Sequence, residues 1–205
     1  MKQNQEAAQR NTSHLRSDTF MEHAISQHRG AVIRLALART REPADAQDIA
    51  QEVFIRLLRS TTIFQDDNHL RAWLLRVTNN ACIDFQRQAW CKRVEPRADM
   101  GTVMDRAVPD PAITAVMEHP VWQAMESLPD KLRVALHLHY VEGYPVNEAA
   151  QIMGCSATTA RSRLHRGRKK LAAELERTVQ RKSSPNVADP GSTSVQEQAN
   201  RVGAR

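Results

Sequence analysis

The stretch VNEAAQIMGCSATTARSRLHRGRKKLAAEL, residues 146–175, decides the fold of the second half of the chain. Its pattern predicts two helices joined by a tight turn. Gly154 suits the left-handed position just beyond the first helix, and Ser156 is a favourable N-cap for the second. Small residues stand where two closely crossing helices require them, at Ala149, Ala150, Ala157 and Ala160. We therefore expect a helix-turn-helix.

The second of these helices has one apolar face and one basic face. Apolar or small residues recur at spacings of four, three and four, at Ala160, Leu164, Gly167 and Leu171. Six basic residues and no acidic one lie between Arg161 and Lys170. Arginine can grip guanine with two hydrogen bonds, while hydroxyl and cationic groups hold phosphates. A merely solvated basic helix is the alternative, but the combined features favour insertion into the major groove. The residues predicted to contact DNA are Thr158, Arg161, Ser162, His165, Arg166 and Lys169.

Composition limits the class of protein. The 205 residues are 41% hydrophobic but only 4% aromatic, with seven glycines, which favours aliphatic helical cores over sheets. The three cysteines, Cys82, Cys91 and Cys155, are too widely spaced for a disulfide framework, so we expect reduced thiols. No apolar run approaches the roughly 18 residues of a membrane span, and the N-terminus lacks the apolar core of a signal peptide. These features predict a soluble cytoplasmic protein without membrane insertion.

Helical periodicity divides the chain into two parts. Three helices are expected at about 20–40, 43–60 and 68–88, and a second helical region at 116–181. The proline-containing stretch 94–115 has no sustained period and is predicted to be a flexible linker. Residues 1–19 and 182–205 are polar and predicted to be disordered. The expected fold is all-α: two small helical domains joined by a linker, the second a helix-turn-helix domain. In the first helix, Met21, Ile25, Val32 and Leu35 recur near helical spacing. The predicted core stripes of the second and third helices are Ala46, Ile49, Ala50, Val53 and Leu57; and Leu70, Leu74, Val77, Ala81 and Phe85.

Two outward faces of the first domain carry a pattern. On the second helix, acidic and amide groups gather at Asp45, Asp48, Gln51 and Glu52. Taken alone, this face is ordinary solvated surface with a Glu52–Arg56 pair. The third helix interleaves aromatic, amide and cationic groups, which suits stacking on single-stranded bases and holding phosphates. A core tryptophan and a plain surface asparagine remain open alternatives there. The strip consists of Trp73, Arg76, Asn80, Ile83 and Arg87, with His69 at its start.

The chain resembles a known family in three stretches: ADAQDIAQEVFIRLLRS (44–60), LRAWLLRVTNNACIDFQRQ (70–88) and SLPDKLRVALHLHYVEGYPVNEAAQIMGCSATTARSRLHRGRKKL (127–171). Together they are similar to the extracytoplasmic-function (group 4) sigma-70-type sigma factors of RNA polymerase. The resemblance implies that 20–93 is a region 2-like domain, which docks on core RNA polymerase and captures the melted −10 element. It implies that 116–181 is a region 4-like domain, which reads the −35 duplex.

The resemblance also implies roles for single residues and for partners. The face around Asp48, Gln51 and Glu52 would bind the polymerase. Asn80 would read a base flipped out of the melted strand, as bases read outside a duplex generally are. Promoter DNA, core RNA polymerase and a dedicated anti-sigma factor are the implied partners.

Two other classes of protein explain the sequence less well. A stand-alone helix-turn-helix transcriptional regulator would leave the acidic face and the Trp73-to-Arg87 strip without a purpose. A nucleic-acid enzyme has little support, since no metalloprotease, phosphate-loop or paired-carboxylate motif occurs in a fitting context. His137 and His139 are two residues apart and would point to different faces of a helix. Asp66 and Asp67 suit a helix start better than a metal site. We therefore expect no catalysis, no cofactor and no metal.

Overall fold

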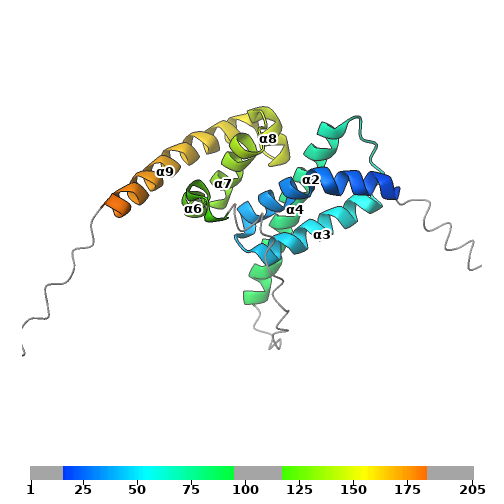
Figure 1. The fold of residues 1–205 in the computed structure, drawn as a ribbon, viewed down its shortest axis with the longest axis horizontal. Helices are drawn as coiled ribbons and strands as arrows, with labels where there is room; N and C mark the ends of the chain where they lie inside the picture. The colour runs from blue at the N-terminus through cyan, green and yellow to red at the C-terminus, as the bar shows by residue number, and fades with distance from the viewer. Residues whose placement is uncertain (1–15, 95–116, 184–205) are drawn as a thin grey trace, which may run out of the picture.

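The computed structural model describes residues 16–94 and 117–183, which form helices and contain no strand (Figure 1). This confirms the all-α prediction. The predicted linker and the predicted disordered ends lie almost wholly outside the described residues, and the domain boundaries stay predictions. In chain order the helices are α2 (Asp18–Thr40), α3 (Pro43–Arg59), α4 (Asp67–Val94), α6 (Pro120–Glu126), α7 (Asp130–Leu136), the π-helix η1 (His137–Val141), α8 (Val146–Ile152) and α9 (Ala157–Ser183).

Helices α2, α3 and α4 form the first unit, and local signals in the sequence set their ends. Helix α2 stops where Arg41 adopts a left-handed φ of 65° and donates its backbone N–H to the Leu37 carbonyl. Pro43 then occupies the first turn of α3, where its missing N–H costs nothing. The Asp66 carboxylate accepts the backbone N–H of His69 at 2.7 Å and so caps α4. The interpretation of the Asp66–Asp67 pair as a helix start is confirmed.

The predicted core stripes are mostly buried. All five stripe residues of α3 are buried, and Val77 and Phe85 of α4 pack half-buried against the same cluster. On α2, Ile25 shares the helical spacing of Val32 and Leu35 but is 39% exposed. The four-residue spacing from Met21 carried Ile25 past the contact with α3 and α4, and the buried position in that turn is Ala24.

Helices α8 and α9 form the predicted helix-turn-helix. Gly154 lies in the turn with a φ of 63°, a conformation that side chains other than hydrogen disfavour. Ser156 Oγ accepts the backbone N–H of Thr159 at 3.2 Å, which confirms the N-cap. Gly167 allows α9 to approach α7 closely, because a Cβ at this position would lie 3.1 Å from Leu136 Cγ. The helix-turn-helix prediction is therefore confirmed in its turn and its cap.

The helix that precedes this motif changes form along its length. Residues Asp130–Leu136 are α-helical, and His137–Val141 widen into a π-helix. Gly143 then turns the chain with a φ of 78°. With this wider turn, His137 is fully buried and Glu142 is also buried in the interior. The sequence predicted a plain aliphatic helix here.

The two units pack against one another. Ala31 and Leu35 of α2 and Leu75 of α4 belong to the same apolar cluster as the residues of α7, α8 and α9. In the other direction, Trp122 of α6 joins the core of the first unit. Figure 1 shows α7 and α8 beside α2 and α4. Among the described helices, none is long and apolar enough to cross a membrane.

Candidate nucleic-acid interface

The basic face of α9 is open to solvent. All six residues predicted to contact −35 DNA are exposed. Arg161 Nη2 lies 3.5 Å from Asn147 Oδ1, and Arg166 Nε donates to the Ser162 carbonyl at 3.4 Å. Both guanidinium groups thus contact neutral oxygens rather than carboxylates. The face is available to a polyanion, while contact with DNA at each position stays a prediction.

The strip along α4 is more varied than its sequence indicated. Arg76, Asn80 and Arg87 are exposed. Trp73 is half-buried and meets the Phe64 ring edge-on, with centroids 5.6 Å apart. Ile83 is half-buried and lines a cavity between the two units. The structure therefore brings three of the five strip residues together on an open face, and base contacts by any of them stay a prediction.

Two neighbouring asparagines have different surroundings. Asn79 is 1% exposed, and its side-chain oxygen accepts a hydrogen bond from Arg39 Nη1 at 2.6 Å. Asn80, the next residue, points to solvent. A rotation of about 100° around the helix thus separates an asparagine that holds α2 against α4 from one that is free to meet a ligand.

The family resemblance implies that the loop from Thr61 to Asn68 captures the melted −10 element together with α4, and the structure adds the exposure of one apolar side chain in this loop. Ile63 is 87% exposed, beside an aromatic cluster in which Phe64 stacks on Phe20 and meets Trp73. The Arg16 guanidinium lies 4.7 Å from the centre of the Phe64 ring. A lone isoleucine in the polar loop TTIFQDD was the available signal. An apolar side chain held out on a supported loop can stack on an unpaired base.

The acidic face of α3 is exposed at Asp48, Gln51 and Glu52, while Asp45 is half-buried. Burial raises the pKa of Asp45, and the nearby charges of Glu42 and Asp48 raise it further. Glu52 accepts a hydrogen bond from Arg56 at 2.8 Å, one helical turn away. Such an exposed pair contributes only a few tenths of a kcal/mol to stability. The face is therefore an accessible charged surface that contributes little to the stability of the fold.

A buried ion cluster joins the two units, and the sequence analysis missed it. The Glu142 side chain has no exposed surface. It accepts two hydrogen bonds from Arg34, at 3.0 and 3.2 Å, and one from Arg71 at 2.6 Å. His137 Nε2 lies 3.2 Å from Glu142 Oε1. The VEGY turn gave no sign that its carboxylate would meet arginines from α2 and α4.

These contacts fix the charges in the cluster. Burial alone would raise the pKa of Glu142, but its interactions with His137 and Arg34 outweigh burial and lower that pKa to about 2. Burial lowers the pKa of His137, and the adjacent Glu142 carboxylate opposes that shift. One carboxylate thus faces two permanently charged guanidinium groups, Arg34 and Arg71.

The described residues hold no candidate metal cluster, and one of their thiols is buried. Residues 16–94 and 117–183 contain no group of three or more His, Cys, Asp or Glu side chains that could hold a metal ion. Cys82 is buried, and burial raises the pKa of its thiol to about 12, which keeps it protonated.

Comparison with known families agrees with this arrangement. Residues 24–91 match Sigma-70 region 2, and residues 119–171 match Sigma-70, region 4. The chain is 33% identical over 149 residues to the ECF RNA polymerase sigma factor SigM of Bacillus subtilis, covering 72% of this chain and 90% of that relative. It is 32% identical over 150 residues to SigE of Mycolicibacterium smegmatis, covering 72% of this chain but only 58% of that longer relative.

Two solved structures share the fold. The sigma factor RpoE of Bartonella quintana, in complex with the anti-sigma factor NepR, is similar with a TM-score of 0.57 at 18% identity, over 76% of this chain and 96% of that one. CnrH, in complex with the cytosolic domain of CnrY, is similar with a TM-score of 0.56 at 22% identity, over 78% and 90%. With both sigma regions present in order and a near full-length relative at 33% identity, the chain belongs to the extracytoplasmic-function family of sigma-70-type RNA polymerase sigma factors.

Proposed function

We propose that this chain binds core RNA polymerase and directs it to a particular set of promoters. The observation that carries the proposal is the presence, on one chain, of sigma region 2 and sigma region 4, with the predicted DNA faces of both exposed. A stand-alone regulator needs only the helix-turn-helix. The function of a stand-alone regulator would leave the other helical unit, with its own polar strip, unexplained.

The −35 element is assigned to α9. An exposed helix with Thr158, Arg161 and Ser162 in its first turns has the side chains that read base edges, because recognition helices contact bases near their N-terminal end. Arg166 and Lys169 lie further along and would hold the phosphate backbone.

The melted −10 element is assigned to α4 and the loop before it. Asn80 is an exposed amide that can pair with the edge of one base, and Arg76 and Arg87 lie at either side to hold phosphates. Ile63 extends from the loop at the same end of the unit as Trp73 and would stack on an unpaired base. Support for this assignment is the accessibility of these groups together with the family membership of the chain.

Polymerase docking is assigned to the exposed α3 face of Asp48, Gln51 and Glu52, with Asp45 at its half-buried border. A charged face with little structural duty suits electrostatic recognition of a protein partner. The chain would act in the cytoplasm as a subunit and not as a catalyst. Because two structural neighbours were solved with an anti-sigma factor or a cytosolic partner domain, we also propose an anti-sigma partner for this chain.

Binding to promoter duplexes with and without core polymerase separates this function from that of a stand-alone regulator. A sigma factor should bind a promoter fragment tightly and selectively only when core polymerase is present. Equally tight and selective binding by the purified chain alone would support the regulator instead.

A further inference from the structure

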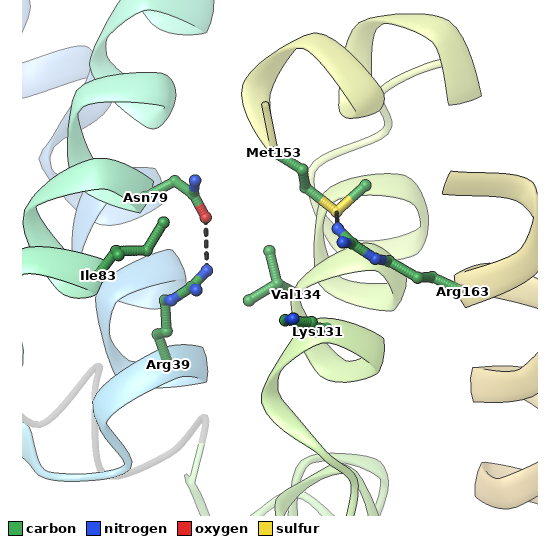
Figure 2. A pocket seen from close by; sticks show the side chains of 7 residues that line it. All are labelled: Arg39, Asn79, Ile83, Lys131, Val134, Met153 and Arg163. Carbon is green, nitrogen blue, oxygen red and sulfur yellow. Dashed lines mark hydrogen bonds between the residues drawn. The ribbon is translucent and has the colours of Figure 1, made fainter. Parts of the chain in front are cut away.

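A small cavity lies where the two units meet. Figure 2 shows its walls: side chains of α2 and α4 on one side, and side chains of α7, α8 and α9 on the other. Its volume is about 90 Å³, several times the roughly 10–15 Å³ that one water needs. The lining residues are Arg39, Asn79, Ile83, Lys131, Val134, Met153 and Arg163.

The charged residues of this lining are all cations, and they come from both units. Arg39 belongs to α2, whereas Lys131 and Arg163 belong to α7 and α9. Among the residues that the structure describes, no carboxylate lines the cavity. Like charges gathered at a partly buried site repel one another, and desolvation adds to that cost unless an anion compensates.

The polar partners of these cations are neutral or weak. Arg39 Nη1 donates to the Asn79 side-chain oxygen, but its Nε is buried and has no hydrogen-bond partner. Arg163 Nη1 reaches only sulfur atoms in the described residues, Met153 Sδ at 3.8 Å and Cys155 Sγ at 3.5 Å. Burial lowers the pKa of Arg39; the nearby Cys82 and Asp130 oppose that shift, and the charge of Arg163 adds to it.

The carboxylate nearest to this cluster is already engaged. Asp130 accepts hydrogen bonds from Arg133 and, at 3.1 Å, from Gln86 Nε2, and Arg41 Nη2 lies 3.6 Å away. Its charge still acts on Arg39, whose pKa it raises, so Asp130 compensates the three cations only in part. The cavity has donors in excess and an unmet need for an anion.

We propose that this cavity binds a small oxyanion of the phosphate class, either free inorganic phosphate or the phosphate end of a small metabolite. Guanidinium groups match the geometry of phosphate oxygens and an ammonium adds a point charge. The Arg39 guanidinium would meet the anion from one wall, and Arg163 and Lys131 would meet it from the opposite wall. Because the donors come from both units, the bound anion holds the units together and stabilises the packed arrangement.

Calorimetric titration of the full chain tests the proposal, with inorganic phosphate and pyrophosphate as probes and chloride used to keep ionic strength constant. We expect one saturable site per chain. Lys131→Gln and Arg163→Gln should each weaken binding at least tenfold. Lys131 is exposed, so its substitution leaves the fold intact. Arg168→Gln, an exposed cation of α9 outside the cavity, is the matched control and should change affinity less than twofold.

The NMR signal of the Arg39 Nε–H group locates the anion. It should shift on titration with the same midpoint as the heat signal. Equal affinities for the two probes would identify free phosphate as the ligand, and at least tenfold tighter pyrophosphate binding would indicate a phosphorylated metabolite. Absence of saturable binding would overturn the proposal. So would binding that Arg166→Gln, on the predicted DNA face, weakens while Lys131→Gln does not.

Discussion

Arg34 and Glu142, which are 108 positions apart in the sequence, form a two-point ion pair that joins α2 to the turn before the helix-turn-helix. The guanidinium lies side-on to the carboxylate, with Nε on one oxygen and Nη2 on the other. This geometry fixes direction as well as distance. With Arg71 on the same carboxylate, it determines how the DNA-reading half sits on the other half.

Replacing Glu142 with Gln should loosen this junction. The amide keeps the shape of the side chain but removes the charge that two guanidinium groups share, so we expect a loss of about 1.5–3 kcal/mol in unfolding free energy. Urea unfolding of the full chain measures it. Glu52→Gln breaks only an exposed pair and should cost less than about 1 kcal/mol. Equal losses in both variants would mean that the buried cluster contributes no more than a surface pair.

The same carboxylate predicts a dependence of stability on pH. The pKa of Glu142 is lowered from 4.5 to about 2 in the folded chain. Because the folded value is the lower one, its contribution is complete above pH 4.5 and is lost as pH falls toward 2. The difference in stability between wild type and Glu142→Gln should therefore shrink over that interval. A difference that stays constant from pH 5 to pH 2.5 would contradict the low pKa.

The sequence predicted the elements better than their assembly. Periodicity and capping residues located α3, α8 and the start of α9, because burial stripes and caps are local features. The packing of the two units was not foreseen. It depends on Leu35 and Leu75, which look like ordinary core residues, and on Glu142, whose partners are far away in the sequence. Ile83 was predicted to lie on an outward strip, but it lines the cavity between the two units. Periodicity within one helix cannot reveal a second unit packed beside it.

Reversing charge on α3 should weaken polymerase binding. Glu52→Lys places a cation on the proposed docking face, where repulsion replaces attraction, while the exposed site leaves the fold intact. Co-purification with core RNA polymerase measures the effect, and we expect at least a tenfold loss. Glu22→Lys, an equally exposed reversal on α2, is the control and should bind normally. Wild-type binding by Glu52→Lys would show that docking uses another surface.

Two cations of α9 should differ in what they recognise. Arg161→Ala should cost about 1–3 kcal/mol on the cognate −35 sequence and little on a scrambled one, if its guanidinium reads a base. Lys169→Ala should weaken both sequences equally and reduce the slope of affinity against salt. The measurement is holoenzyme binding to both duplexes over a range of salt concentrations. Equal losses on both duplexes for Arg161→Ala would reduce its role to phosphate contact.

Run-off transcription tests the central claim, that the chain gives core RNA polymerase promoter specificity through its two halves. Core polymerase with the chain should produce transcripts from discrete genomic start sites, each preceded by a shared −35 and −10 element. Asn80→Ala should reduce these transcripts at least tenfold with unfolding stability within about 0.5 kcal/mol of wild type, since Asn80 is exposed and buried Asn79 holds the fold. Transcripts no different from those of core polymerase alone would contradict the account.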